Sequence, residues 1–488
     1  MEYLMVFMDI QLWLAMILAM AAGIVIGALP GLTPAVGVGL LVPVTFGMSP
    51  VTGLVILGSI YVGAVYGGAI TAILLNIPGE PGNIVTTFDG YPMARGGDPA
   101  RALGLAGISS TIGGIFSVLV LILLAPPLAK VALRFGPGEY FCVAIFGLTV
   151  IVSFSSGAMI KGIVSAVLGL AIGLIGQDPI MGYPRFAFIP ELIGGVDLIP
   201  CVIGLFCFSE GLTLVLEKQM SLADGGISKL SYASAFRDIL SNKFNLFRSS
   251  VIGTIIGIIP GAGLAMGALI SYNEARRFSK NKQLYGKGSP EGLIASEASN
   301  NAVVGGSLVP LITLGVPGNA VSAIFLGGII IQGLPIGPEL FTKHSLVIYP
   351  FLIGLVIAHF ILLALSLLGV RYFAKTLQLP MKFIAPTVCL LSVIGSYSVN
   401  NNFTDVFIMM AFGFLGFFMK KNGYSGVSLI LGLILGPMAE NSLQQALIIS
   451  RGSFSFILSP ICLFILALSV GSLLMSLYFD RNNPCNED

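Results

Sequence analysis

The sequence contains few charged residues, and this scarcity excludes most classes of soluble protein. Only 9% of its 488 residues are Asp, Glu, Lys or Arg, against roughly a quarter in an average soluble domain. No charged residue occurs between Ile10 and Gly79, a run that can cross a bilayer about three times at roughly 20 residues per helix. The uncharged segments are continuous, whereas a membrane β-barrel would show short alternating ones. The sequence therefore predicts an all-α polytopic membrane protein.

The sequence also lacks the patterns of catalytic, metal and nucleotide sites. Its two histidines, His344 and His359, have no potential ligand nearby in the sequence. There is no P-loop, no nucleophile elbow with partner residues and no zinc signature. We therefore expect no enzyme, no cofactor, no transition-metal site and, without a basic patch, no nucleic-acid partner. The six cysteines show no metal or redox spacing and are expected to pack as small apolar side chains: Cys142, Cys201, Cys207, Cys389, Cys462 and Cys485.

What the sequence does contain is a pair of Pro-Gly dipeptides that recurs in its second half. The first half reads GIVIGALPGLTPAVG and then YGGAITAILLNIPGEPGN, and the second reads GTIIGIIPGAGLAMG and then VGGSLVPLITLGVPGNAV. Pro30–Gly31 thus corresponds to Pro260–Gly261, and Pro78–Gly79 corresponds to Pro317–Gly318. Proline removes a backbone donor and glycine disfavours a helix. We therefore predict four broken apolar helices and call the breaks the first and second elbow of each half.

The recurrence divides the chain into a first membrane repeat over 1–216, a polar linker over 217–248 and a second membrane repeat over 249–488. Apolar residues at near-helical spacing in the linker, such as Phe236 and Leu240, predict an amphipathic helix in the membrane interface, or else a simple tether. We expect about 10–12 transmembrane helices plus re-entrant or broken half-helices. The candidate apolar segments are 10–29, 34–48, 53–77, 103–127, 139–156, 159–177, 190–216, 249–272, 302–316, 319–334, 346–369, 383–399, 404–420, 424–437 and 454–479.

Broken helices at matching positions of two repeats indicate the substrate site of a secondary transporter. Irregular backbone at membrane depth must face protein or a water-filled cavity, because lipid cannot satisfy its polar groups. A single Pro-Gly dipeptide would be better explained by a kink in a membrane helix or by close helix packing than by a functional site. The duplication of both elbows favours a functional site.

Helices that begin after the elbows predict a site for an anion. Thr33 is a suitable N-cap before Pro34, and Pro81 and Asn319 are suited to start helices after the second elbows. The first turn of such a helix has unpaired N–H groups and the positive end of its dipole. The predicted substrate-binding residues are Pro30, Gly31, Leu32, Thr33, Pro78, Gly79, Pro260, Gly261, Ala262, Gly263, Pro317, Gly318 and Asn319.

Helices that end before the second elbows predict a site for a cation, because their last carbonyl groups lack helical partners. Glu297 precedes an uncharged run over 298–338, where it either neutralises a cation or marks the aqueous end of a helix. The predicted Na⁺-binding residues are Leu75, Asn76, Glu297, Asn300, Asn301, Thr313, Leu314 and Gly315.

Other charged residues lie between the apolar segments. Arg95 and Arg101 follow Asp89, and one of these arginines is suited to bind a carboxylate bidentately, unless the segment is a solvated loop. Three further acidic residues are interpreted as the ends of spans: Glu191, Asp197 and Asp405.

These segments resemble the large membrane subunit of tripartite tricarboxylate transporters, the TctA family. The resemblance rests on residues 27–50, 66–97, 291–321 and 333–341, although Ser296 stands where the family pattern has proline. It implies a multi-pass permease of the bacterial inner (cytoplasmic) membrane that works with a small membrane subunit and a periplasmic substrate-binding protein. It also implies uptake of di- and tricarboxylates such as citrate, with Na⁺ or H⁺ as the coupling ion. By motif, it places the binding positions at 30–33, 76–79, 297–301 and 313–319.

The residues and the resemblance together predict a secondary active transporter that works by alternating access, with the anion at broken-helix N-termini. A passive anion channel is the alternative, because it also uses half-helices, and an intramembrane enzyme would need a reactive constellation that the sequence does not show.

Replacing Gly318 by Leu is expected to abolish uptake, because the larger side chain would disturb the second elbow, while membrane insertion stays largely intact. Substrate uptake by cells and the amount of protein in the membrane fraction measure the two effects. Normal uptake by this variant would show that the second elbow is not part of the site.

Overall fold

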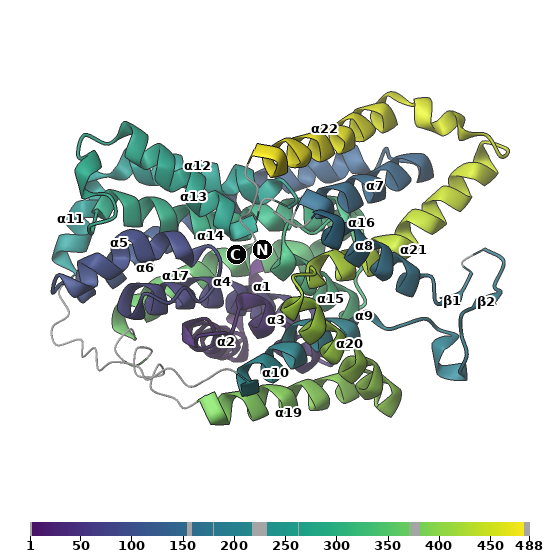
Figure 1. Ribbon diagram of the computed structural model, residues 1–488, viewed down its shortest axis with the longest axis horizontal. Helices are drawn as coiled ribbons and strands as arrows, with labels where there is room; N and C mark the ends of the chain where they lie inside the picture. Colours follow the sequence, from purple (N-terminus) through teal and green to yellow (C-terminus); the bar gives the residue numbers. More distant parts are fainter. Residues whose placement is uncertain are drawn as a thin grey trace. The chain divides into compact units, whose positions relative to one another are not determined.

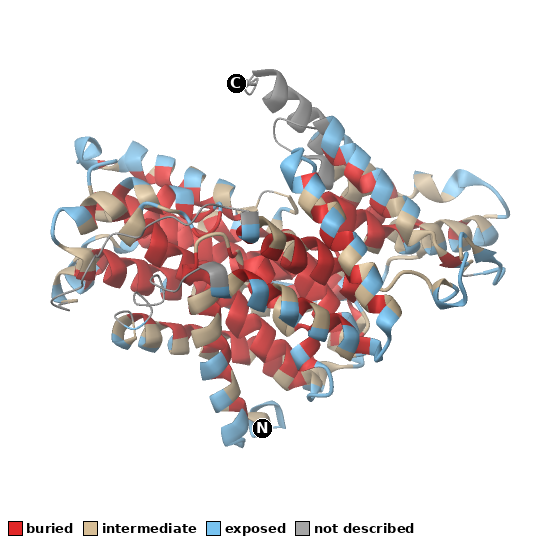
Figure 2. Ribbon diagram, turned by 60° about the horizontal axis from the view of Figure 1, so that its bottom comes forward, coloured by how far each residue is buried: buried red, intermediate tan, exposed pale blue. Residues whose placement is uncertain are grey.

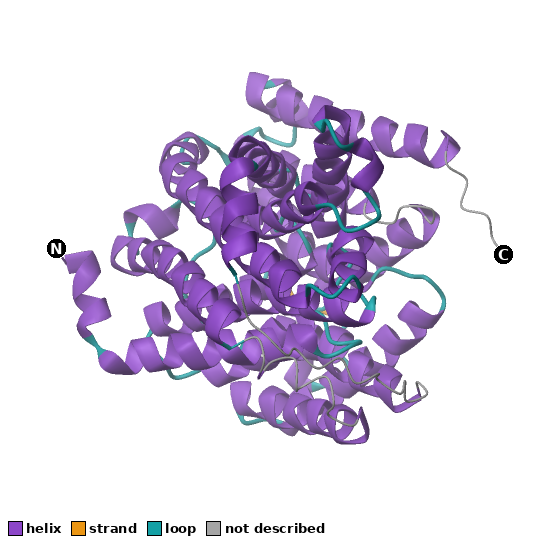
Figure 3. Cartoon of the chain, turned by 90° about the vertical axis from the view of Figure 1, so that its left-hand side faces the viewer, coloured by secondary structure: helices purple, strands orange, loops and turns teal. Residues whose placement is uncertain are grey.

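The computed structural model describes residues 2–153, 159–178, 180–216, 232–261, 263–369, 372 and 381–482, and most of them are helical (Figure 3). The strands among them form one antiparallel hairpin of β1 (Gly176–Gln177) and β2 (Pro184–Arg185). This confirms the predicted all-α class. Eight helical stretches of the described chain are long and apolar enough to cross a membrane: Ile10–Ala28, Pro50–Leu75, Pro99–Ala132, Leu198–Val215, Ser345–Leu368, Phe383–Asn400, Phe403–Lys421 and Gly426–Ile449.

Shorter apolar helices accompany these spans: Pro34–Thr45, Ile160–Gly173, Ala320–Ile331 and Pro460–Gly471. They are too short to cross a bilayer alone, as expected of half-helices. The described residues thus contain eight candidate spans and four shorter apolar helices, whereas the sequence predicted 10–12 transmembrane helices. The number of true crossings stays a prediction.

The chain folds as two compact units, and each unit takes segments from both halves of the sequence (Figure 1). Unit 1 comprises Met1–Pro127 and Glu210–Cys389, and unit 2 comprises Leu128–Ser209 and Leu390–Asp488. The predicted division into repeats of 1–216 and 249–488 follows sequence order and stays a prediction. Residues 217–231 of the predicted linker lie outside the described residues.

Unit 1 contains the four elbows and the helices that flank them. Its helices are α1 (Glu2–Met5), α2 (Ile10–Ala28), α3 (Pro34–Leu41), α4 (Pro50–Leu75), α5 (Asn83–Arg95), most of α6 (Pro99–Ala132), α10 (Ser209–Leu216), α11 (Ala233–Ser241), α12 (Lys243–Ile258), α13 (Gly263–Phe278), α14 (Pro290–Leu314), α15 (Ala320–Ile331), α16 (Glu339–Thr342), α17 (Ser345–Leu368) and the first part of α19 (Met381–Asn400), with short 3₁₀ turns at Val6–Met8, Pro43–Thr45 and Lys282–Leu284.

Unit 2 contains the remaining helices and the hairpin. They are α7 (Pro137–Ser153), α8 (Met159–Gly173), α9 (Leu198–Val202), the π-helix Ile203–Phe208, α20 (Phe403–Lys421), α21 (Gly426–Ile449) and α22 (Pro460–Asn482), with 3₁₀ turns at Pro190–Leu192 and Phe454–Leu458.

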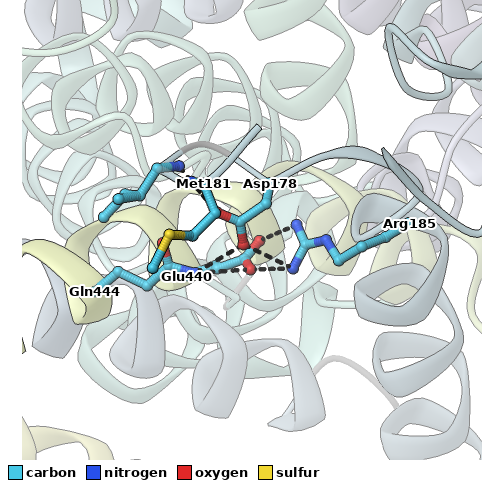
Figure 4. A network of polar contacts seen from close by, with 6 residues as sticks. Asp178, Met181, Arg185, Glu440 and Gln444 are labelled. Carbon is cyan, nitrogen blue, oxygen red and sulfur yellow. Dashed lines mark hydrogen bonds and ion pairs between the residues drawn. The ribbon is translucent and has the colours of Figure 1, made fainter. Parts of the chain in front are cut away.

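A network of polar contacts ties the hairpin of unit 2 to α21 (Figure 4). Arg185 binds Glu440 with both terminal nitrogens, and its Nη1 lies 3.6 Å from Asp178 Oδ2. Gln444 Nε2 donates to the same Asp178 oxygen at 3.2 Å. The backbone N–H of Met181 also donates to Asp178, and bonds of this kind hold the pKa of that carboxyl below its ordinary value.

The described part of the predicted linker carries exposed apolar side chains, as an amphipathic helix would. On α11, Ile239 is buried, whereas Phe236 and Leu240 are 54% and 67% exposed. Placement of this helix in the membrane interface stays a prediction.

Helices α2 and α4 pack in contact and run in the same direction. A Cβ added to Gly23 would lie 2.6 Å from the carbonyl oxygen of Ile60, and one added to Gly27 would lie 2.0 Å from that of Ala64. The contacts advance together along both helices, so the helices are parallel. Only glycine permits this approach of the two backbones.

Helices α12 and α14 repeat this packing at corresponding positions. A Cβ on Gly253 would lie 2.3 Å from the carbonyl oxygen of Ser299, and one on Gly257 would lie 2.7 Å from that of Val303. The elements α2–α5 and α12–α15 thus share both their order and their closest contacts.

Buried residues make up much of the described helices (Figure 2), and the long helices α4 and α14 of unit 1 are buried along most of their length. Every residue of α14 from Gly292 to Thr313 is buried, and the most apolar window of α4 is 100% buried. Polar side chains on α14 therefore need partners within the protein, because neither water nor lipid reaches them.

Helix α5 crosses from its own repeat to α14 and runs antiparallel to it. Glu80, just before α5, is hydrogen-bonded to Asn300 in the middle of α14. Met93, near the end of α5, lies beside Gly288, just before the start of α14.

Helix α15 makes the equivalent crossing to α4, again antiparallel. Asn319, at its start, is hydrogen-bonded to Tyr61. Gln332, at its end, lies against Gly53, and its Nε2 also donates to the carbonyl of Thr45 at 2.8 Å.

The directions of α5 and α4 decide how the two long helices are related. Asn83, at the start of α5, lies beside Gly68, whereas Gly90, later in α5, lies beside Ile73. Helix α5 therefore follows the direction of α4 while it opposes that of α14. The two long helices run in opposite directions, as corresponding helices do in inverted-topology repeats.

Gly27→Ala is expected to lower the thermal stability of the purified protein, because the added Cβ would overlap the carbonyl group of Ala64. Overpacking of this kind costs about 1–3 kcal/mol. Gly327→Ala is the matched control, since nothing lies within 4 Å of a Cβ there and helix propensity favours alanine by up to about 1 kcal/mol. Thermal unfolding in detergent measures both variants, and equal midpoints would contradict the proposed packing.

Candidate functional site

The first elbows are left-handed glycine turns between two helices. Gly31 and Gly261 have φ angles of 85° and 99°, a backbone conformation that strongly favours glycine. Helix α3 begins at Pro34 with Thr33 as its N-cap, as predicted. In the second repeat α13 begins at Gly263, and Ala262 lies outside the described residues.

The second elbow of the first repeat folds back along the helix that precedes it. Helix α4 ends at Leu75, and Asn76 forms a left-handed cap with φ of 59°. The chain then returns, so that a Cβ on Gly79 would lie 2.5 Å from the Cα of Gly68 and 2.5 Å from the carbonyl oxygen of Gly27. Glycine is required at position 79 by this close approach, not by its backbone angles.

The second elbow of the second repeat folds back in the same manner. Helix α14 ends at Leu314, with Gly315 as its left-handed cap at φ of 75°. A Cβ on Gly318 would lie 2.8 Å from the Cα of Ser307 and 2.9 Å from the carbonyl oxygen of Gly257.

The two elbows of each repeat lie against each other. In the second repeat the backbone N–H of Gly261 donates to the carbonyl of Gly318 at 3.0 Å. In the first repeat Gly79 packs on the carbonyl of Gly27, close before Pro30. Within each repeat, the structure therefore places the first and second elbow side by side, and their joint role as a substrate site stays a prediction.

Each second elbow also forms a hydrogen bond to the long helix of the other repeat. Asn300 Nδ2 donates to Glu80 Oε1 at 2.8 Å, and Asn319 Nδ2 donates to the hydroxyl of Tyr61 at 2.8 Å. Glu80 and Asn319 both directly follow the glycine of a second elbow, and Tyr61 and Asn300 occupy matching places on α4 and α14. The same contact thus occurs twice, once with a carboxylate and once with an amide.

Around Glu80 lies a group of buried polar side chains that we call the polar cluster. Its members come from the second elbow of the first repeat and from α5, α6 and α14, and each is at most 3% exposed. They are Glu80, Asn83, Thr86, Ser110, Glu297 and Asn300. Glu297 accepts hydrogen bonds from the hydroxyls of Thr86 and Ser110, the latter at 2.8 Å. Asn83 lies beside Glu297.

Several atoms of the polar cluster have no hydrogen-bond partner. They are Glu80 Oε2, Asn300 Oδ1 and the amide oxygen of Asn83. Asn301, the next residue on α14, is likewise buried with both amide atoms unpartnered. Buried polar atoms of this kind are costly, and their concentration at one place makes the polar cluster a candidate binding site.

The predicted cation-binding residues fall into two separate groups. Glu297 and Asn300 belong to the polar cluster, and Asn301 neighbours it. Thr313, Leu314 and Gly315 lie at the end of α14, about 24 Å along the axis from Glu297 at a rise of 1.5 Å per residue. The hydroxyl of Thr313 donates to the carbonyl of Val309.

The corresponding residues of the first repeat, Leu75 and Asn76, lie at the end of α4, where Asn76 is exposed. Pro78 is also exposed, whereas Pro317 is buried. The predicted carbonyl ligands at these helix ends are thus not brought to Glu297.

Sequence reasoning missed four members of the polar cluster: Glu80, Asn83, Thr86 and Ser110. One signal was available, since Glu80 is the first charged residue after the long uncharged run and directly follows an elbow. The other three are ordinary polar residues, and only the packing of α5 and α6 on α14 gives them a role.

The predicted helix starts after the second elbows have different outcomes. Asn319 caps α15 as predicted, through a capping box with Ser322. Pro81 does not start a helix: α5 begins at Asn83, because a turn in which the Asn83 N–H donates to the Glu80 carbonyl at 3.0 Å occupies that place. Thr33 makes no side-chain capping bond, so the start of α3 is less fully capped than that of α15.

Arg101 is engaged within the protein: its Nε lies 2.7 Å from Asp238. Arg95 lies over the ring of Tyr91, with its guanidinium carbon 5.8 Å from the ring centroid. Neither arginine is a member of the polar cluster.

In unit 2 Asp197 and Asp405 both accept a hydrogen bond from Asn400, at 2.8 and 2.9 Å. Asp197 also caps α9. These contacts agree with the interpretation of the two residues as helix ends.

Asp89 fixes the start of α14 relative to α5. It is fully buried, and its Oδ1 accepts the backbone N–H groups of Gly286, Gly288 and Ser289 at 2.8, 3.0 and 2.8 Å. Its Oδ2 accepts the hydroxyl of Tyr272 at 2.9 Å. Because Ser289 is the N-cap of α14, Asp89 positions the helix that carries Glu297 and Asn300.

Comparison with known proteins gives a consistent result over most of the chain. A family model described as the tripartite tricarboxylate transporter TctA family matches residues 13–431. The "Uncharacterized 52.8 kDa protein in TAR-I ttuC' 3'region" of Agrobacterium vitis is 35% identical over 457 residues, which are 93% of this chain and 91% of the relative. The "Uncharacterized protein in TAR-II ttuC' 3'region" of the same organism is 33% identical over 226 residues, 46% of this chain and 93% of that relative. No solved structure matches the chain.

Asp89→Asn is expected to destabilise the protein more than Tyr272→Phe, because it removes the charge that strengthens three backbone N–H bonds to Oδ1 and replaces the acceptor of the Tyr272 hydroxyl by a donor, whereas the tyrosine change removes one bond. Hydrogen bonds to a charged group contribute about 1.5–3 kcal/mol each. Thermal unfolding of the purified chain ranks wild type, Tyr272→Phe and Asp89→Asn in falling order. The reverse order would show that Asp89 does not hold α14 in place.

Proposed function

The chain belongs to the tripartite tricarboxylate transporter TctA family, and from that membership we propose that it is the permease through which a small organic carboxylate crosses the membrane. It is a multi-pass membrane protein. A member of this family is the large subunit of a tripartite transporter, which implies partner subunits. We propose that these are a small membrane subunit and a periplasmic substrate-binding protein, and that the assembly lies in a bacterial inner membrane.

One observation supports the proposal most directly. The second elbow of each repeat contacts the middle of the other repeat's long helix, α14 or α4. Glu80 and Asn319 each cross to the other repeat, and unpartnered polar atoms surround Glu80. Broken backbone and buried polar groups at a repeat interface are what a secondary transporter uses to hold substrate and coupling ion.

The proposed substrates are di- and tricarboxylates such as citrate. The carboxylate would be held at helix N-termini, and that of α3, which begins at Pro34 after Thr33, is one proposed position. No ion pair between described residues places an arginine in the polar cluster, so the proposed binding relies on backbone N–H groups and amide side chains.

The coupling ion, Na⁺ or H⁺, would enter the polar cluster. Two buried carboxyl groups there, Glu80 and Glu297, lack a basic partner among the described ion pairs. An incoming cation would reduce the repulsion between these groups and an anionic substrate.

Alternating access is the proposed mechanism, and the opposed directions of α4 and α14 support it. Inverted repeats make two conformations of similar energy available, because exchanging the conformations of the repeats opens the site to the opposite side.

Substrate-stimulated exchange tests this function. We expect proteoliposomes that contain the permease and its small membrane subunit to take up labelled citrate, succinate or malate faster when the same unlabelled compound is inside, with the binding protein supplied outside. Alternating access requires this counterflow, because a loaded carrier returns with its internal substrate.

Protein-free liposomes are the control for leakage. Flux that follows only the concentration gradient, without stimulation from inside, would favour the passive channel. No flux of any of these carboxylates would remove the proposed substrate class.

A further inference from the structure

Two buried carboxyl groups in the polar cluster have no counter-charge. Glu297 is 0% exposed and Glu80 is 3% exposed. The ion pairs between described residues involve neither of them. An ionised carboxylate in such a place is strongly unfavourable unless a cation accompanies it.

The cluster offers several oxygen atoms to such a cation. Glu80 Oε2, Asn300 Oδ1 and Asn83 Oδ1 are buried and unpartnered. Both amide oxygens lie against glycine backbone: a Cβ on Gly82 would be 2.1 Å from Asn300 Oδ1, and one on Gly68 would be 2.1 Å from Asn83 Oδ1. Larger residues at positions 68 and 82 would displace these oxygens.

The number of free oxygens favours a metal cation over a proton. One proton on Glu80 can donate to only one amide oxygen, and it would leave the other of Asn83 Oδ1 and Asn300 Oδ1 without a partner. Hard cations bind carboxylate and amide oxygens together, so one ion completes the whole set.

The charge of the cluster favours a monovalent ion. It contains two carboxyl groups, and the described residues hold no group of three or more His, Cys, Asp or Glu that would suit a metal. Ca²⁺ sites use more oxygen ligands than the free ones named here, and Mg²⁺ is usually bound by one or two carboxylates together with water and substrate phosphates.

The matching place in the second repeat offers no such site. Asn319, which corresponds to Glu80, accepts the backbone N–H of Ser322 through Oδ1 at 2.8 Å and donates to Tyr61 through Nδ2. Its side-chain atoms are thus already paired, and its side chain carries no charge. The two halves of the repeat interface are alike in geometry and different in charge.

We propose that Glu80, Asn83, Glu297 and Asn300 form a single Na⁺ site and that Glu80 is the ligand which confines it to the first repeat's elbow. The role of this site as the coupling-ion site rests on the proposed transport function, whereas Na⁺ binding itself can be measured without transport. Na⁺ enters before the organic anion, because the carboxylates of Glu80 and Glu297 would repel the anion if no cation were bound.

Binding of ²²Na⁺ to the purified full-length chain in detergent tests the site without transport. Wild type is expected to bind Na⁺ saturably and to unfold at a higher temperature in sodium chloride than in choline chloride. Glu80→Gln and Glu297→Gln are each expected to weaken Na⁺ binding by at least about tenfold, since each removes a charged ligand. Glu274→Gln, at a partly exposed carboxylate paired with Arg277, is the matched control and retains wild-type binding.

A measurement in choline chloride separates lost binding from lost folding. Glu80→Gln removes a buried charge that has no counter-charge among the described ion pairs and keeps an acceptor for Asn300, so this variant is expected to unfold at or above the wild-type temperature when Na⁺ is absent. A lower temperature together with lost binding would mean that Glu80 is structural and would overturn the site.

Wild-type affinity for Na⁺ in Glu80→Gln would also overturn the proposal, as would wild-type protein that shows no Na⁺ binding or is stabilised only by acid. Carboxylate counterflow by the same variants in proteoliposomes distinguishes failure of the Na⁺ site from failure of the transport function. If counterflow persists without Na⁺ binding, the transport function stands and the Na⁺ site falls.

Discussion

The close approach of glycine backbones holds the centre of unit 1 together. Gly79 lies against Gly68 and Gly27, and Gly318 lies against Ser307 and Gly257. These contacts turn each second elbow back along its own helix, so that the residue after the elbow reaches the middle of the other repeat's long helix. A side chain at either glycine would push the elbow outward, and the contacts of Glu80 and Asn319 across the repeats would be lost.

The complete burial of α14 makes these contacts important for its polar side chains. Because α14 lies inside the unit, its polar side chains depend on what the elbows and α5 bring to them. Glu297 finds the hydroxyls of Thr86 and Ser110, whereas Glu80, Asn83 and Asn300 keep atoms without partners. Unpaired polar atoms raise the free energy of a low-dielectric interior. In the proposed Na⁺ site, pairing these atoms with the ion would contribute to the free energy of binding.

The two repeats share geometry and differ in chemistry. The paired contacts of Glu80 with Asn300 and of Asn319 with Tyr61 place a carboxyl group on one side and a closed amide network on the other. Asp89 adds a second difference, since its carboxylate clamps the start of α14, whereas the start of α4 is held by the amide of Gln332 at Thr45.

The sequence by itself determined the helical membrane class, the four elbows and the helix starts at Pro34 and after Asn319, because uncharged runs, Pro-Gly pairs and N-caps act through neighbouring residues. It also identified Glu297 and Asn300. Only the tertiary structure decided that Glu80 meets Asn300, 220 residues away, that Thr313 lies far from Glu297, and that α4 and α14 run in opposite directions. These relations depend on how closely two helices pack and on where an elbow returns, and no local pattern of residues encodes either distance.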